Sequence, residues 1–274
     1  KTITLKNSKN IPNAISDGFN VAMSPRRGPV CINLPRNLLA EKNNYKINEK
    51  IKSFKNTNNT QSKPDTIKRA AKLISNSSKG IIIVGGGIKY TSGFKPVIEL
   101  AEYLNVPIVT AAGHGDAIPF NHKLNAGQMG PRGNPVATKL TKEADIILAI
   151  GTRLGFNSTF YSFENINKKA KIIQVELEKK MLGKYFPIKI GINADAATTA
   201  NQLLREFKKQ KIKSEVKIWT EKFKNERSNY LFQRNNIPSK NFPIQPPGLF
   251  KELRKVLPKN SAITLDAGTL CLQA

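Results

Sequence analysis

Cysteine and histidine are scarce in this sequence. The 274 residues include two histidines and two cysteines, and the cysteines, Cys31 and Cys271, lie far apart with no Cys-x-x-Cys pair. This pattern excludes a disulfide framework and the ligand spacing of a structural zinc site. It fits a reducing compartment, so we expect a cytoplasmic protein.

Long apolar runs are also lacking. No segment approaches the roughly 20 apolar residues that a membrane-spanning helix needs. The first ten residues, KTITLKNSKN, contain no apolar segment of a signal peptide. We therefore predict no membrane partner. The sequence starts with Lys rather than Met and stops just after an apparent strand, so we expect the chain to be a piece of a longer protein.

Acidic residues are few relative to basic ones. The 45 Lys and Arg against 19 Asp and Glu give a formal net charge of +26. Such an excess indicates either an anionic partner such as nucleic acid or a compositional bias toward Lys and Asn. The densest basic stretch, 208–227, is interleaved with glutamates, and the sequence shows no recognised nucleic-acid-binding motif. We predict no nucleic-acid partner and keep a basic nucleic-acid-binding protein as an alternative.

Apolar residues make up 39% of the chain, with 13 Phe and 6 Tyr, which is enough for a packed core. In the middle of the chain, short apolar runs alternate with segments of helical spacing. Near-continuous apolar strands between helices are typical of a parallel sheet covered on both faces, so we predict an α/β fold with a Rossmann-like central domain. Strands are predicted over 80–84, 107–110, 145–150, 171–175 and 188–192, and helices over 66–75, 94–104, 136–141 and 196–207.

Less regular segments flank this alternation. A helix over 11–23 and a strand within VCINL (30–34) precede a polar linker rich in Asn and Lys. A charged helix over 208–233, a Pro-rich break, a helix over 249–257 and a strand over 262–265 follow it. The last of these units looks like the opening of a second α/β domain.

Three consecutive glycines, Gly85, Gly86 and Gly87, directly follow the first central strand. Glycines at that place let backbone N–H groups approach a phosphate at the carboxyl end of a strand. The dinucleotide fingerprint is incomplete because Tyr90 stands in place of the third glycine, and no Gly-Lys-Ser/Thr of a Walker A loop follows. A tight strand-to-helix turn is the structural alternative.

Two further loops are predicted to leave strands at the same edge of the sheet, over 113–116 and 151–153. Ligands of open α/β sheets bind outside the carboxyl ends of the strands. Arg153 is suited to hold a phosphate through a bidentate contact, or to form a surface salt bridge instead. We expect the glycine-rich 127–133 segment to be a long, flexible loop that contacts a ligand.

Titratable side chains form no complete catalytic set. His114 with Asp116 invites an acid–base or metal interpretation, but no Cys, Glu or second His lies at ligand spacing. Glu176 and Glu178 surround the end of a strand, where they either meet a ribose or are solvated, and no serine stands in a nucleophile elbow. We therefore assign no catalytic and no metal-binding residue in this chain.

Several segments become recognisable together: GIIIVGGGI, VPIVTAAGHGDAIPFNHKLNAGQMGPRGN, EADIILAIGTRLG, KIIQVELEKKMLGK and INADA. In this order they resemble the central domain of thiamine-diphosphate-dependent enzymes, above all the acetolactate synthase branch, which includes sulfoacetaldehyde acetyltransferase and glyoxylate carboligase. GPVCINLPRNLL resembles the end of the family's pyrimidine-binding domain, and SAITLDAGT the start of its pyrophosphate-binding domain.

The resemblance implies five parts of the chain. They are the end of the pyrimidine-binding domain (1–40), a linker (41–64), the central, nucleotide-binding-like domain (65–209), a charged helix with a linker (210–248) and the start of the pyrophosphate-binding domain (249–274).

The resemblance also implies a function: a carboligase or 2-oxo acid decarboxylase that uses thiamine diphosphate and Mg²⁺ as a homodimer or homotetramer. The family's catalytic glutamate would precede Lys1 and its magnesium motif would follow Ala274, so we expect this chain alone to be inactive. The substrate would be a small 2-oxo acid or a related compound. A sulfoacetaldehyde acetyltransferase-like or glyoxylate carboligase-like member and a stand-alone nucleotide-binding module stay open as alternatives.

The family's motifs imply cofactor contacts as well. Acetolactate synthases hold FAD in the central domain, although it has no redox role in their main reaction. The sequence departs from the family pattern at Gly155, Asn157, Met181, Ala194 and Asn37, which leaves FAD, another nucleotide or no ligand open. The contacts implied for a nucleotide are Gly85, Gly86, Gly87, Thr110, Met129, Gly130, Arg132, Gly151 and Arg153, and those for the diphosphate of thiamine are Gly268 and Thr269.

Overall fold

The computed structural model describes residues 1–24, 27–44, 60–89, 94–212, 217–237, 242–264 and Gly268. The chain forms two compact units, Lys1–Thr60 and Gln61–Ala274. The predicted division of the chain into five parts stays a prediction.

The first unit is a small α/β element. Its strands β1 (Thr2–Thr4) and β2 (Cys31–Asn33) pair in parallel, with Ile3 opposite Ile32. The helices are α1 (Ile11–Ala22) and α2 (Arg36–Leu39). Buried Leu5, Ala14 and Leu38 form its core, so this unit buries few apolar side chains of its own.

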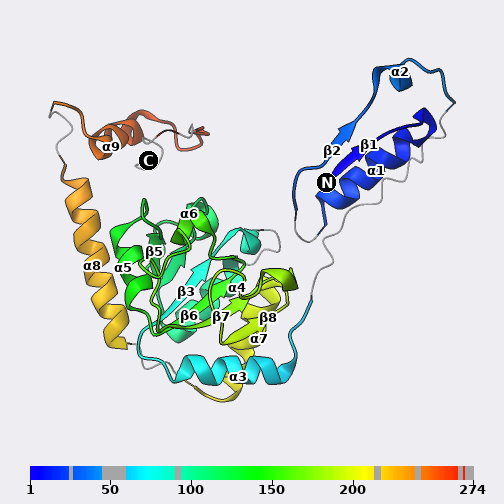
Figure 1. The fold of residues 1–274 in the computed structure, drawn as a ribbon. Helices are drawn as coiled ribbons and strands as arrows, with labels where there is room; N and C mark the ends of the chain where they lie inside the picture. Colours follow the sequence, from blue (N-terminus) through cyan, green and yellow to red (C-terminus); the bar gives the residue numbers. More distant parts are fainter. Residues whose placement is uncertain are drawn as a thin grey trace. The chain divides into compact units, whose positions relative to one another are not determined.

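The second unit contains a six-stranded parallel sheet (Figure 1), which confirms the predicted α/β fold. The strand order is β5-β4-β3-β6-β7-β8, and each pair of neighbours is parallel. The strands are β3 (Gly80–Val84), β4 (Ile108–Thr110), β5 (Asn125–Gln128), β6 (Ile146–Ile150), β7 (Lys171–Val175) and β8 (Ile190–Ile192).

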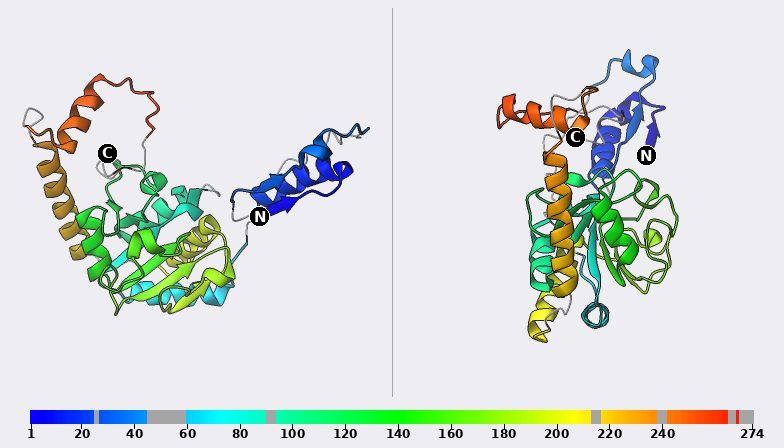
Figure 2. Two further views of the ribbon diagram at one scale, coloured as in Figure 1. Left: turned by 45° about the horizontal axis from the view of Figure 1, so that its top comes forward. Right: turned by 90° about the vertical axis from the view of Figure 1, so that its left-hand side faces the viewer.

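Helices cover both faces of this sheet (Figure 2). α4 leads from β3 to β4 and α5 leads from β5 to β6 in the opposite direction, so right-handed crossovers place these helices on opposite faces. α7 packs against both α3 and α4, whereas α8 packs against α5. The helices are α3 (Pro64–Ser75), α4 (Phe94–Leu104), α5 (Pro135–Glu143), α6 (Phe156–Thr159), α7 (Ala196–Lys209), α8 (Lys217–Asn235) and α9 (Pro246–Val256).

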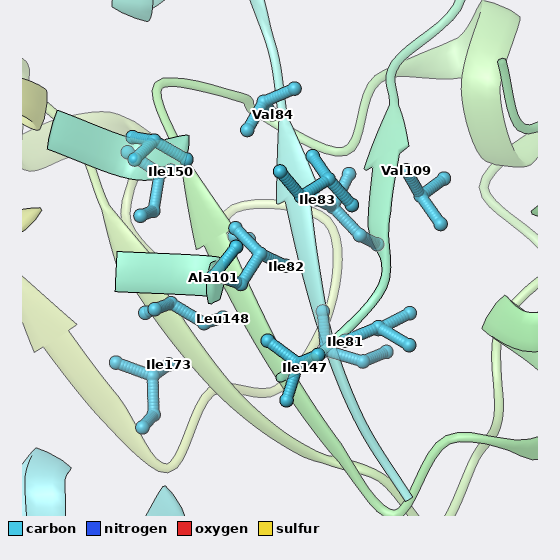
Figure 3. Close-up of a cluster of buried hydrophobic side chains, with 14 of the residues drawn as sticks. Ile81, Ile82, Ile83, Val84, Ala101, Val109, Ile147, Leu148, Ile150 and Ile173 are labelled. Atoms are coloured by element: carbon cyan, nitrogen blue, oxygen red, sulfur yellow. The ribbon is translucent and has the colours of Figure 1, made fainter. Parts of the chain in front are cut away.

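The core follows from the composition of the central strands. Every residue of β3 and β6 is buried, and most are Ile, Val or Leu, which suit a strand covered on both faces. Figure 3 shows the side chains of Ile81–Val84 interleaved with those of the neighbouring strands, including Val109, Ile147 and Ile173. β3 and β6 form the buried centre of the sheet, and the candidate site lies at their carboxyl ends.

The predicted helix over 208–233 is wrong at its start. α7 continues to Lys209, and α8 spans Lys217–Asn235. Lys211 adopts the left-handed conformation (φ 52°), and the N–H of Ile212 donates to the carbonyl of Phe207 at 3.1 Å. These are the features of a Schellman helix end, here with lysine in place of the usual glycine.

Two strand predictions also need correction. Asn125–Gln128 forms β5, so the expected long loop over 127–133 is shorter than its composition indicates. Ala262–Thr264 form no strand and are exposed, and Leu265 lies outside the described residues. A strand needs a neighbour for its backbone hydrogen bonds, and none pairs with 262–264 in the part of the chain that the structure describes. Among the same residues, no helix is long and apolar enough to span a membrane.

Candidate functional site

The candidate site lies where the strand order of the sheet reverses. From β3 the chain moves outward to β4 and β5, and then returns to β6 on the other side of β3. The loops after β3 and β6 therefore leave the carboxyl edge side by side, at the point where open α/β sheets bind their ligands. Gly85, Gly86 and Gly87 follow β3, and Gly151 and Arg153 follow β6, as predicted.

Close packing between these two loops accounts for three of the glycines. The N–H of Gly87 donates to the carbonyl of Gly151 at 2.9 Å, and that of Gly85 donates to Ile150 at 3.1 Å. A Cβ on Gly87 would lie 2.6 Å from the Cα of Gly151, and a Cβ on Gly85 would lie 2.5 Å from the carbonyl oxygen of Gly151. These glycines thus join the loops, and the N–H groups of Gly85 and Gly87 are engaged within the protein.

Gly86 has a different neighbour, the ring of His114 from the loop after β4. A Cβ on Gly86 would lie 2.8 Å from His114 Cε1. His114 Nδ1 is buried and has no hydrogen-bond partner among the described residues. Burial lowers the pKa of His114, the positive charges of Lys89 and Arg153 lower it further, and Asp116 acts in the opposite direction. These effects favour the neutral form of the ring.

The charged groups that act on His114 leave one positive charge, that of Arg153, uncompensated. Lys89 forms an ion pair with Asp116, and its hydrogen bond holds the pKa of that carboxyl below the ordinary value. Arg153 is exposed and has no ion pair among the described residues. Thr110, at the end of β4, is fully buried, and its Oγ1 has no hydrogen-bond partner among them. An anionic ligand with acceptor atoms fits this combination of cations and unpartnered polar atoms.

The turn after β5 serves mainly as a packing surface. Met129 is fully buried, and its N–H donates to the carbonyl of Thr110 at 2.8 Å. Gly130 (φ 117°) lies beneath α6, since a Cβ there would be 2.9 Å from the carbonyl oxygen of Asn157. Arg132 is exposed at the tip of the turn. Of this group, Arg132 alone offers a charged side chain to a ligand.

Comparison with known proteins decides the family. Residues 67–203 match the family model described as "Thiamine pyrophosphate enzyme, central domain". The chain belongs to the thiamine pyrophosphate enzymes. The match includes the whole six-stranded sheet, from β3 to β8, and the loops that form the candidate site.

Relatives within the thiamine pyrophosphate enzymes extend the similarity to most of the chain. A probable acetolactate synthase large subunit of Methanocaldococcus jannaschii is 29% identical over 96% of this chain and 45% of its own length. A sulfoacetaldehyde acetyltransferase of Roseovarius nubinhibens is 28% identical over 89% of this chain and 43% of its own length. The chain spans about half the length of the curated relatives it matches.

The other predicted residues of this thiamine pyrophosphate enzyme are placed as follows. Gly268 is exposed, with no atom within 4 Å of a Cβ built on it, and Thr269 lies outside the described residues. His122 Nε2 lies 3.3 Å from Glu102 Oε1. No group of three or more His, Cys, Asp or Glu able to hold a metal is present in the described part of the chain.

A hollow of about 430 Å³ lies between the turn after β5 and helix α5. It includes Gly130 and Gly133 but none of the residues that follow β3 and β6. Because its walls are mainly the outer face of α5, we assign the candidate site to the charged loops after β3, β4 and β6 instead.

Sequence reasoning missed two features of the candidate site. Lys89 was not singled out, although it follows the glycines by two positions and its positive charge lowers the pKa of His114. Exposed aromatic side chains on and after α6 were also missed: Phe156, Phe160, Tyr161 and Phe163. Their signal was available in the segment FNSTFYSF, which places four aromatics in eight residues directly after the Arg153 loop.

Proposed function

We propose that this chain is part of a carboligase or 2-oxo acid decarboxylase of the acetolactate synthase type, which acts with thiamine diphosphate and Mg²⁺. The observation that supports this most is the similarity to acetolactate synthase large subunits along 96% of the chain, well beyond the central domain. Sulfoacetaldehyde acetyltransferases match nearly as well, so an acetyltransferase acting on sulfoacetaldehyde is the second candidate.

Thiamine diphosphate supplies the electron sink for decarboxylation in such an enzyme. This chain supplies the central domain, and we assign it no group that exchanges a proton with the substrate. The proposed protein is a cytoplasmic homodimer or homotetramer that takes a small 2-oxo acid, and the chain alone is inactive.

Within that enzyme, we propose that the candidate site, formed by the loops after β3, β4 and β6, binds a nucleotide, either FAD or another one. Arg153 and Lys89 supply positive charge to its phosphates, and Thr110 Oγ1 and His114 Nδ1 are buried polar atoms in need of a partner. Gly85, Gly87 and Gly151 join the loops after β3 and β6 by close backbone packing.

The test of the enzymatic function is an assay of the full open reading frame. We expect consumption of pyruvate or another 2-oxo acid, with release of CO₂, which requires both thiamine diphosphate and Mg²⁺. The 274-residue chain under the same conditions is the matched control and should show no turnover. A full-length protein without thiamine-dependent turnover of any 2-oxo acid or of sulfoacetaldehyde would refute the proposal and favour a stand-alone nucleotide-binding module.

A further inference from the structure

A group of stacked aromatic rings lies exposed at the carboxyl edge of the sheet. We call Phe156, Phe160, Tyr161 and Tyr185 the aromatic shelf. The ring centroids of Phe156 and Phe160 are 4.8 Å apart with planes 20° from parallel, and those of Tyr161 and Tyr185 are 4.5 Å apart at 25°. Phe156 and Tyr161 connect the two pairs at 5.6 Å. Phe156, Phe160 and Tyr161 are 54%, 41% and 48% exposed, so the shelf offers free ring surface.

The backbone that carries the shelf is strained. Phe160 (φ 49°) and Tyr161 (φ 55°) are consecutive left-handed residues, a conformation that is unfavourable for side chains other than glycine. Buried Thr159 maintains it, because its Oγ1 donates to the carbonyl of Leu154 at 3.0 Å and accepts from the N–H of Tyr161 at 3.1 Å. A strained turn that holds apolar rings in solvent is a feature of ligand-contacting segments.

The shelf belongs to the same edge of the sheet as the candidate site. Ser158, between Phe156 and Phe160, accepts a hydrogen bond at 2.9 Å from the N–H of Ala112 in the loop after β4. The backbone of Asn157 and Ser158 also packs on Gly130 after β5. α6 is therefore fixed to two of the loops that surround the candidate site.

Cations border the shelf. Lys184 Nζ lies 5.3 Å from the ring centroid of Tyr185. The pKa of Tyr185 is lowered, first by its hydrogen bond with Tyr161 and then by the charges of Lys184 and Arg153. The charge of Arg153 thus acts on one residue of the shelf, Tyr185, and on one residue of the candidate site, His114.

A flat aromatic surface at the same sheet edge as Arg153 and Lys89 matches a ligand with a planar ring at one end and phosphates at the other. We propose that the aromatic shelf stacks the base of the nucleotide whose phosphates lie near Arg153. This inference rests on the proposed nucleotide site, and it adds that the ring of the ligand, and not only its phosphates, is recognised by this chain.

The test compares a ligand that has a base with one that lacks it. Equilibrium dialysis measures the binding of ADP and of inorganic pyrophosphate to the 274-residue chain. Phe160→Ala should weaken ADP binding about 10-fold, as expected for one lost stacking contact, and leave pyrophosphate binding unchanged. Arg153→Gln should weaken both ligands. Phe160→Tyr keeps a ring and should retain ADP binding.

Phe232→Ala is the matched control, because Phe232 is an exposed phenylalanine on α8, a different helix. It should leave both affinities unchanged, and circular dichroism checks that each variant is folded. If the wild-type chain binds neither ligand, the proposed nucleotide site fails and the shelf inference fails with it. If the wild type binds both but Phe160→Ala changes neither affinity, or both equally, the shelf inference alone is refuted. The shelf inference is also refuted if Phe160→Ala alters only the oligomeric state in sedimentation.

Discussion

At the scale of single residues, Gly151 allows the loops after β3 and β6 to pack closely because it has no side chain. It is left-handed (φ 61°), and a Cβ there would lie 2.8 Å from the Cα of Gly87. Gly151→Ala should therefore lower the free energy of unfolding by about 2–4 kcal/mol, through left-handed strain and a backbone clash. Chemical denaturation followed by the fluorescence of Trp219, the one tryptophan of the chain, measures this.

Gly155→Ala is the control for that substitution. No atom lies within 4 Å of a Cβ built on Gly155, and its φ is not positive. The substitution should therefore change the free energy of unfolding of the protein by no more than about 0.5 kcal/mol. Equal decreases in the free energy of unfolding for Gly151→Ala and Gly155→Ala would contradict the role of Gly151 in joining the two loops.

His114 predicts a pH dependence of stability. Burial and the cations Lys89 and Arg153 lower its pKa in the folded state below the ordinary value of 6.5. As the pH falls through this value, the unfolded chain therefore binds more protons than the folded chain does. The free energy of unfolding falls as a result. Relative to His114→Gln, the wild type should become less stable as the pH is lowered from 8 to 5.

Urea denaturation of both proteins at several pH values, monitored by Trp219, measures that difference. Asp116 also has a lowered pKa, but its ordinary value is 3.8, so its stabilising effect is lost only below this window. A difference between wild type and His114→Gln that stays constant from pH 8 to 5 would refute the electrostatic description of His114.

At the scale of elements, α8 is attached to the second unit by a few side chains. Trp219 is buried and its Nε1 donates to the carbonyl of Gly80 at 3.1 Å, while Phe223, one turn later, is 1% exposed. Phe223→Ala should destabilise the second unit by about 3–5 kcal/mol, because it leaves a cavity in the core. Its Trp219 emission should also shift to longer wavelength as the contact with α8 loosens.

Phe232→Ala, on the same helix, is the comparison. Phe232 is 70% exposed, so its loss should change the free energy of unfolding by no more than about 0.5 kcal/mol and leave the emission of Trp219 unchanged. If Phe223→Ala and Phe232→Ala changed the free energy of unfolding and the Trp219 emission to a similar extent, α8 would not be held through the packing of Phe223.

Elements with a clear apolar period were predictable. The strand over 80–84 and the helix over 94–104 have the observed bounds, because each buries a regular set of apolar residues. β5 was missed because its residues Asn125, Ala126, Gly127 and Gln128 contain no apolar run. The end of α7 was missed because a left-handed lysine, Lys211, ends the helix without the glycine that usually marks such a site.

At the scale of the whole molecule, the net charge of +26 predicts weak, non-specific attraction to polyanions. We expect double-stranded DNA to bind no more tightly than about 1 µM at 150 mM salt, and the affinity to show no sequence preference. Fluorescence anisotropy with labelled duplexes of different sequence checks this. Tight binding of one sequence at that salt concentration would favour the nucleic-acid alternative.

The sequence by itself determined the parallel α/β architecture and the family, because both depend on local apolar periods and on the order of short motifs along the chain. It also located most of the loops at the carboxyl edge. Only the tertiary structure decided what those loops do: Gly87 meets Gly151, Gly86 meets His114, and Ser158 binds the loop after β4. These contacts join residues that are 28 to 64 positions apart and on different strands, as for Gly86 with His114 and Gly87 with Gly151. No local pattern encodes such contacts, since they arise from the strand order that brings the ends of β3, β4 and β6 together.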